Sequence, residues 1–207
     1  MLSAPPRPEI PALATLPNVI DSARLRLRPL AITDVEALWP YVSDENVARM
    51  MAWAAHRDRA ETEAFIAECV ADFGRGKAMV WAIEIDGAAR GVIGLHGITW
   101  QYRAWRIDRA ELGYWIGAPY WGKGYMSEAA LAATSWAFQT LGLHKVTIGC
   151  VEGNVASQKI IEKLGFRFLA MFEEDAWRDG KWLQHRRYEL TAGEWADVTS
   201  TQRFVRR

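Results

Sequence analysis

The stretch Tyr120–Met126 most limits what this chain can fold into, because it places Gly122 and Gly124 between two regular elements. The residues before it, Ala110–Ile116, are typical of a strand, and the residues after it, Ser127–Leu141, have apolar side chains at helical spacing. A helix N-terminus presents unpaired backbone N–H groups, and glycine lets a bulky anion approach them closely. The pattern predicts a loop that can bind a pyrophosphate.

Alternatives compete with this interpretation. A Gly-x-Gly between a strand and a helix also occurs where the chain only makes a tight turn. The sequence lacks the Gly-x-x-x-x-Gly-Lys-Ser/Thr spacing of a nucleoside-triphosphate loop, and it lacks the Gly-x-Gly-x-x-Gly that opens the helix of a dinucleotide site. A shorter phosphate-binding loop and a simple turn both remain open.

Other segments accompany the glycine loop, namely Arg24–Pro29, Asn154–Phe166 and Gly180–Trp182. Together with the loop they resemble the GCN5-related N-acetyltransferase (GNAT) family over about residues 22–195, and specifically its RimJ/RimL branch, which acetylates protein N-termini. Trp121 stands where the general family has Gln or Arg, as expected in that branch. Met126 departs from the family pattern, because it replaces the small residue that ends the loop.

The resemblance implies the fold and the cosubstrate. The implied fold is α/β (α+β), with a central, twisted, mixed and mostly antiparallel sheet of about six to seven strands flanked by helices, in which a splayed strand pair binds acetyl-CoA. Loop amides would bind the pyrophosphate, and an open strand edge, an Asn and a Ser would contact the pantetheine arm. The implied acetyl-CoA contacts are Tyr114, Trp115, Ile116, Trp121, Gly122, Lys123, Gly124, Tyr125, Met126, Asn154 and Ser157.

Acetyl transfer to an amine also needs a base, and many relatives use a tyrosine to protonate the departing thiolate. Glu111 is the candidate base, and an ion pair with Arg106 or Arg109 is the alternative role for its carboxylate. The family's tyrosine position holds Ile161 here. Ser157 is therefore the candidate proton donor, or it only positions the cosubstrate.

The RimJ/RimL resemblance implies a protein N-terminal α-amine as the acceptor. Such an amine has a pKa of about 8 and loses its proton more readily at neutral pH than a lysine side chain, with a pKa of about 10.4. A small amine, such as a polyamine or an aminoglycoside, is the alternative acceptor, and the acidic run 173–175 could bind it. An acyl-CoA-binding protein without turnover is an alternative of another class, favoured by Ile161 and Met126.

The composition limits the classes of molecule that this chain is expected to bind. The chain has 25 Lys and Arg against 25 Asp and Glu, so no overall charge attracts it to nucleic acid or to an anionic membrane. The aromatic and arginine residues of 100–109 therefore favour an acceptor-binding or dimer-contact loop, and a homodimer is compatible with it. Cys69 and Cys150 are expected to be buried free thiols, and no metal is expected. No apolar run reaches signal or membrane-spanning length, which predicts a cytoplasmic protein.

The 207 residues suit a single domain. Residues 1–21 contain five of the 8 prolines and are expected to form an extended arm, followed by a folded domain over 22–199 and a tail over 200–207. Apolar alternation predicts strands near 24–28, 78–85, 90–96, 110–116, 145–151, 166–172 and 186–190, and capping patterns predict helix starts at Thr33, Asp58, Asn154 and Thr191. For Asn154, helix capping is the alternative to a cosubstrate contact.

Overall fold

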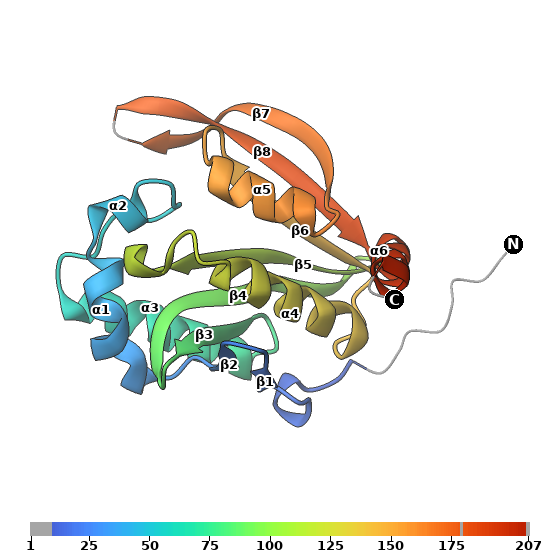
Figure 1. The fold of residues 1–207 in the computed structure, drawn as a ribbon, viewed down its shortest axis with the longest axis horizontal. Coiled ribbons are helices and arrows are strands. Elements are labelled where there is room, and N and C mark those ends of the chain that lie inside the picture. Colours follow the sequence, from blue (N-terminus) through green and yellow to red (C-terminus); the bar gives the residue numbers. More distant parts are fainter. Residues whose placement is uncertain (1–9, 179, 206–207) are drawn as a thin grey trace, which may run out of the picture.

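The structure is a computed structural model that describes residues 10–178 and 180–205 of the chain. Its centre is an 8-stranded sheet in the order β1-β2-β3-β4-β5-β6-β8-β7 (Figure 1). Neighbouring strands pair antiparallel except β5 and β6, which pair parallel, so the expected mixed and mostly antiparallel sheet is confirmed. The strands are β1 (Ile20–Asp21), β2 (Arg26–Pro29), β3 (Met79–Ile85), β4 (Ala88–Tyr102), β5 (Trp105–Ile116), β6 (Lys145–Val151), β7 (Arg167–Arg178) and β8 (Lys181–Thr191).

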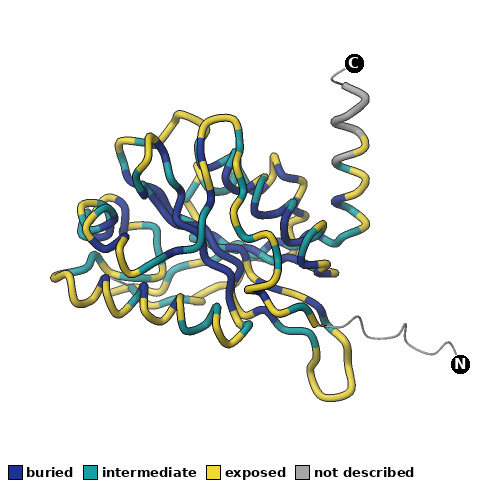
Figure 2. The backbone as a smooth tube through the Cα atoms, turned by 90° about the horizontal axis from the view of Figure 1, so that it is seen from below, coloured by how far each residue is buried: buried dark blue, intermediate teal, exposed yellow. Residues whose placement is uncertain are grey.

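Helices cover both faces of this sheet, and Figure 2 shows buried strands as a central layer with exposed backbone on the outer surfaces. One face packs against α4 and α5, and the other packs against α1 and α3. The α-helices are α1 (Val35–Val42), α2 (Glu45–Ala48), α3 (Arg59–Gly74), α4 (Tyr125–Gln139), α5 (Val155–Lys163) and α6 (Ala192–Val205), and the 3-10 helices are η1 (Leu13–Thr15), η2 (Ile32–Asp34) and η3 (Ala118–Tyr120).

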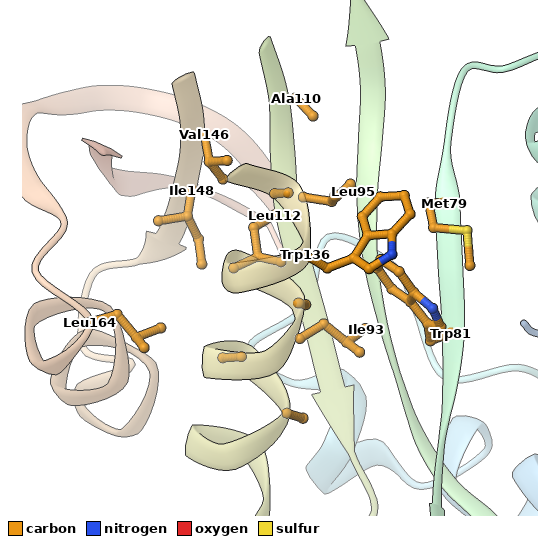
Figure 3. Packing of buried hydrophobic residues seen from close by; sticks show 14 of the residues in the cluster. Met79, Trp81, Ile93, Leu95, Ala110, Leu112, Trp136, Val146, Ile148 and Leu164 are labelled. Carbon is orange, nitrogen blue, oxygen red and sulfur yellow. The ribbon is translucent and has the colours of Figure 1, made fainter. Parts of the chain in front are cut away.

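Alternation along the strands divides the buried side chains between two clusters. On β5, Leu112 and Ile116 belong to the cluster under α4, whereas Trp115 belongs to the cluster under α1 and α3. Figure 3 shows Trp136 of α4 lying against the sheet, where its ring centroid is 5.1 Å from that of the fully buried Trp81. Successive β5 side chains therefore point to opposite faces of the sheet.

The described part of the N-terminal segment is folded, contrary to the expectation of an extended arm. Leu13 is buried in the main core, and β1 adds an eighth strand to the seven predicted ones. The indole N–H groups of Trp81 and Trp136 donate to the backbone oxygens of Asn18 (2.8 Å) and Pro17 (2.5 Å). The proline-rich composition did not predict this folded segment, because the segment is held by contacts with residues far along the chain. At the other end, α6 continues past residue 200, where a tail was expected.

The β7–β8 hairpin is longer than its apolar pattern predicted. The strand predicted to end near residue 172 continues to Arg178, so the acidic run 173–175 lies within β7. Past the Phe172–His185 pair, β8 no longer pairs with β6, so the two strands of the hairpin pair only with each other, and much of β7 is exposed. A strand without a buried face has no reason to alternate apolar and polar residues, so the sequence carried no signal for it.

The helix starts that depend on side-chain caps are largely as predicted. The Asp58 carboxylate accepts from the N–H of Glu61 at 3.1 Å, and the Asn154 side chain accepts from the N–H of Ser157 at 3.2 Å. Thr191 and Glu194 cap α6 reciprocally. The prediction for Thr33 was wrong, because that residue lies inside η2 and α1 begins at Val35. The cysteines are buried free thiols, as predicted.

Candidate active site

The sheet opens between its two parallel strands. β5 and β6 pair only from Arg109 with Lys145 to Glu111 with Thr147. Beyond that point β5 continues to Ile116 beside β4, and β6 continues to Val151 beside β8. The edge of β5 that faces β6 is therefore open from Leu112 onwards, which is the predicted splay.

A cavity of about 640 Å³ lies at this opening. It combines strand residues from β4 to β8 with the start of α5 and the connection between α2 and α3. Its polar and titratable lining residues are His96, Glu111, Tyr114, Cys150, Asn154, Ser157, Asp175, Arg178, His185 and Arg187, and its large apolar lining residues include Met50, Met51, Trp53, Phe65, Trp115, Trp177 and Leu183. Of the predicted site residues, the cavity brings together Glu111, Tyr114, Trp115, Asn154 and Ser157.

Glu111 projects from β5 at the start of the opening, and its side chain is about half exposed. Its Oε1 lies 3.2 Å from a guanidinium nitrogen of Arg187, a residue of β8, and Arg187 also contacts the Asp175 carboxylate at 3.1 Å. The suggested partners Arg106 and Arg109 were wrong, since Arg106 pairs with Asp108 instead. An ion pair is thus present, but it crosses the cavity from another strand.

Tyr114 and Ser157 meet on the opposite face of β5. The phenol oxygen lies 3.0 Å from the Ser157 hydroxyl, which sits in the first turn of α5 above the Asn154 cap. Burial raises the pKa of Tyr114 to about 12, so the phenol keeps its proton at neutral pH. Ile161, at the family's tyrosine position, is fully buried in the core. A tyrosine hydroxyl therefore does reach the cavity, but from β5 and not from α5.

The glycine loop lies past the end of β5 and outside the cavity lining. Gly122 and Gly124 have φ values of 70° and 81°, which favour glycine, and Gly124 forms the N-cap of the 15-residue helix α4. The N–H groups of Gly122, Lys123 and Gly124 have no acceptor among the described residues. Free amides at a helix N-terminus form a concave donor surface for an anion.

Two cations flank this loop. Lys123 belongs to it, and Arg24 donates to the Lys123 carbonyl at 2.8 Å. The Glu128 carboxylate fixes Arg24 in place by accepting from its Nε at 2.7 Å and its backbone N–H at 2.9 Å. Although burial of Glu128 opposes the change, hydrogen bonds from Ser22 and Arg24 lower its pKa. The position of Arg24 at the loop had not been predicted.

Other predicted loop residues have structural contacts. The Trp121 indole donates to the carbonyl of Ile116 at 2.8 Å and so ties the loop to the end of β5. The Met126 side chain is buried in the core, so it does not obstruct the loop as its size had suggested. The Tyr125 ring lies under Arg24, whose guanidinium carbon is 4.8 Å from the ring centroid.

One arginine joins the two walls of the cavity. Arg178, at the tip of β7, donates to the backbone carbonyls of Ala48 (2.7 Å), Met51 and Trp53 (3.3 Å). These carbonyls lie at the last residue of α2 and in the connection from α2 to α3, about 130 residues earlier in the chain. The contacts hold the aromatic wall that contains Trp53 next to the β7–β8 hairpin.

Comparison with known proteins gives this arrangement a family. The model of the acetyltransferase (GNAT) domain matches residues 24–167, which is more than half of the chain and includes the splayed strand β5, the glycine loop and α5. The chain belongs to the GNAT acetyltransferase family. It is therefore an acetyl-CoA-dependent N-acetyltransferase, and the residues at the splay and the glycine loop fit that cosubstrate.

Individual relatives of this GNAT acetyltransferase are distant. The uncharacterized N-acetyltransferase YoaA of Bacillus subtilis is 26% identical over 78% of this chain and 90% of its own length. The [ribosomal protein uS5]-alanine N-acetyltransferase of Escherichia coli is 32% identical, over only 41% of this chain and 43% of its own. A crystal structure of the microcin C7 self-immunity acetyltransferase MccE with acetyl-CoA and AMP shares the fold, with a TM-score of 0.75 and 22% identity over 84% of this chain and 97% of that one.

The cavity also contains residues that sequence reasoning missed. They are His96, His185, Arg187, Arg178 and the phenol of Tyr114, which had been expected to contribute only its backbone. A signal existed for the histidines, because Gly94, Gly113 and Gly149 interrupt apolar strands, and a glycine within a strand often marks a close approach. As for membranes, none of the helices in the described ranges has the length and apolarity needed to span a bilayer.

Proposed function

We propose that this enzyme transfers the acetyl group of acetyl-CoA to the α-amine of a protein N-terminus. The observation that carries the proposal is the charge balance of the cavity lining. Its carboxylates, Glu111 and Asp175, both contact Arg187. A peptide N-terminus brings a single amine, whereas a polycation would need several uncompensated carboxylates. The partial likeness to an enzyme named for the alanine of a ribosomal protein supports the same acceptor class.

The small-amine alternative has less support. Glu173 and Glu174 line a neighbouring hollow with Glu152, whereas Asp175 lines the main cavity. Glu173 also accepts a hydrogen bond from Gln184, and Glu152 is paired with Arg186. The acidic run therefore does not converge on one pocket that could bind a polyamine or an aminoglycoside.

The non-catalytic alternative loses its supporting features. Ile161 is remote from the reaction, since it is buried, and Tyr114 supplies a phenol instead. Met126 is packed away from the loop. A protein that only bound acyl-CoA would not need the paired hydroxyls of Tyr114 and Ser157 or a carboxylate on the other face of β5.

In the proposed reaction, acetyl-CoA supplies an activated acetyl group and a thiol leaving group. The N–H groups of Gly122 to Gly124, with Lys123 and Arg24 beside them, bind its pyrophosphate. The open edge of β5 and Asn154 orient the pantetheine arm. Glu111 attracts the amine of the acceptor, and it is the first candidate to accept a proton from that amine.

The thiolate is assisted on the other face of β5. Tyr114 remains protonated at working pH, and its hydroxyl shares a hydrogen bond with Ser157. One of these hydroxyls can donate to the sulfur as negative charge develops there. Because β5 side chains alternate, the groups that receive the amine and the groups that assist the thiolate lie on opposite sides of the strand.

The test is acetyl-CoA-dependent thiol release with a matched acceptor panel. It consists of short peptides that begin with Ala, Ser or Met, the same peptides with a blocked N-terminus, spermidine and an aminoglycoside. Turnover of free but not of blocked peptides is expected. Turnover of spermidine or the aminoglycoside alone would overturn the acceptor assignment, and binding of acetyl-CoA without turnover would favour the non-catalytic alternative.

A further inference from the structure

A histidine ring lies against the backbone of the β4–β5 pair inside the cavity. A Cβ added at Gly94 would be 2.8 Å from Nε2 of His96, and one added at Gly113 would be 3.5 Å from its Cδ2. Gly94 and Gly113 are paired in the ladder, and both lie on the face that carries Glu111. The glycines thus provide the space in which the imidazole lies over the strands, and any side chain at Gly94 would displace it.

His96 is available for chemistry in a way that the other cavity histidine is not. More than a third of His96 is exposed, it lines the cavity, and its ring makes no hydrogen bond to the described residues. His185 lies over Gly149 with its Nδ1 buried and 3.7 Å from an Asp175 oxygen. Of the two histidines, His96 is the more exposed, since the His185 side chain is only 19% exposed.

Glu111 is the direct neighbour of His96. The two residues face each other in the antiparallel β4–β5 ladder, so their side chains leave the same face of the sheet about 5 Å apart at Cβ. The Glu111 carboxylate is held from the other side by Arg187. A carboxylate between a guanidinium and an imidazole is well placed to stabilise positive charge on that imidazole.

We propose that His96 accepts the proton of the acceptor amine and that Glu111 orients the amine and the protonated ring. This inference rests on the proposed N-acetyltransferase reaction. As the C–N bond to the acetyl carbon forms, the amine nitrogen gives one proton to His96. The C–S bond breaks with its electron pair on sulfur, where a hydrogen bond from the Tyr114 or Ser157 hydroxyl stabilises the thiolate. The thiolate then takes up a proton from solvent, and His96 releases the proton of the amine to solvent, so each donor returns to its starting state.

The charges around His96 are consistent with that role. Desolvation lowers the pKa of His96 below its usual 6.5, and the charges of Glu111 on β5 and Asp72 on α3 oppose this without reversing it. On β8, Arg187 lines the same cavity. The ring is therefore neutral at pH 7 and can accept a proton. An ordinary imidazole, with a pKa of about 6.5, is a stronger base than an ordinary carboxylate at about 4.3 and lies closer to an α-amine at about 8.

The experiment compares pH–rate profiles at saturating peptide and acetyl-CoA. The variants are His96→Gln, Glu111→Gln and the control His144→Gln, whose exposed side chain lies outside the cavity. The wild type is expected to lose rate as pH falls through an apparent pKa below about 6.5. His96→Gln should lower kcat by roughly 10²-fold and remove that acid limb. Glu111→Gln should keep the limb, and the control should match the wild type.

Two further measurements distinguish the loss of a base from a loss of acetyl-CoA binding. Acetyl-CoA affinity by calorimetry should be unchanged in His96→Gln, and activity of His96→Ala should be partly restored by added imidazole. Retention of the acid limb in His96→Gln, its loss in Glu111→Gln, or a lack of imidazole rescue would overturn the role of His96 while the transferase activity stands. A wild-type enzyme that acetylates no amine would overturn the proposed function, and this inference with it.

Discussion

The glycine at the start of α4 offers the sharpest test of the phosphate loop. Gly124 has a φ of 81°, and its N–H belongs to the free donor surface. A Cβ at this position would lie 3.2 Å from an Arg24 nitrogen, which belongs to the end of a flexible side chain, so space is a minor obstacle. The main cost of Gly124→Ala is the free energy needed to hold an L-residue in the left-handed backbone conformation, about 1–2 kcal/mol.

A matched control exists at the other end of the same helix. Gly142 has a φ of 75°, follows α4, and has nothing within 4 Å of an added Cβ. Gly142→Ala should therefore carry the same backbone strain without touching the loop. In a chain of this size, 1–2 kcal/mol corresponds to a fall in Tm of about 2–8 °C, and both variants should show it by circular dichroism.

Only Gly124→Ala should weaken binding of the cosubstrate. To the extent that the unbound variant loop relaxes out of the left-handed conformation, its Tm falls less, and binding must restore that conformation at a cost of up to 1–2 kcal/mol, or about a 5- to 30-fold rise in Kd. Calorimetric titration with coenzyme A, which cannot react, measures this directly. Wild-type affinity in Gly124→Ala without a fall in Tm, or an equal loss of affinity in Gly142→Ala, would refute the assignment of the loop amides to the pyrophosphate.

The remaining predictions concern the cavity and the support of the loop. Tyr114→Phe removes the phenol that meets Ser157, so kcat should fall by roughly 10²-fold while coenzyme A affinity holds; an unchanged kcat would exclude the phenol from thiolate departure. Arg178→Ala leaves the carbonyls of Ala48, Met51 and Trp53 without this donor, so urea denaturation should show a loss of about 1–3 kcal/mol and kinetics a raised KM for peptide but not for acetyl-CoA. Because the folded pKa of Glu128 is lowered, its stabilisation is present above the unfolded value of about 4.3 and lost as pH falls through the folded one. Glu128→Gln should thus unfold more easily than wild type at pH 7, and this difference should shrink as the pH falls below about 4.3, as measured by urea titration at each pH.

The sequence by itself determined the fold family and the order of most elements. Apolar alternation located seven strands, and side-chain caps located the starts of α3, α5 and α6, since these signals depend on neighbours within a few residues. The glycine loop could be predicted for the same reason, because a left-handed backbone at a helix start favours glycine whatever residues surround it. Features that depend only on neighbouring residues, such as caps and left-handed glycines, can therefore be predicted from a short stretch of sequence.

Only the tertiary structure decided which side chains meet at the site. Arg187 contacts Glu111 from 76 residues away, and Tyr114 contacts Ser157 from 43 residues away. No pattern in the neighbouring sequence indicates either partner. The splay of β5 from β6 brings these pairs to one cavity, and the alternation of β5 then assigns them to opposite faces. His96 became a candidate base only when the glycines of two strands were found beneath its ring. Such contacts depend on register and packing between distant segments, which no short stretch of the sequence records.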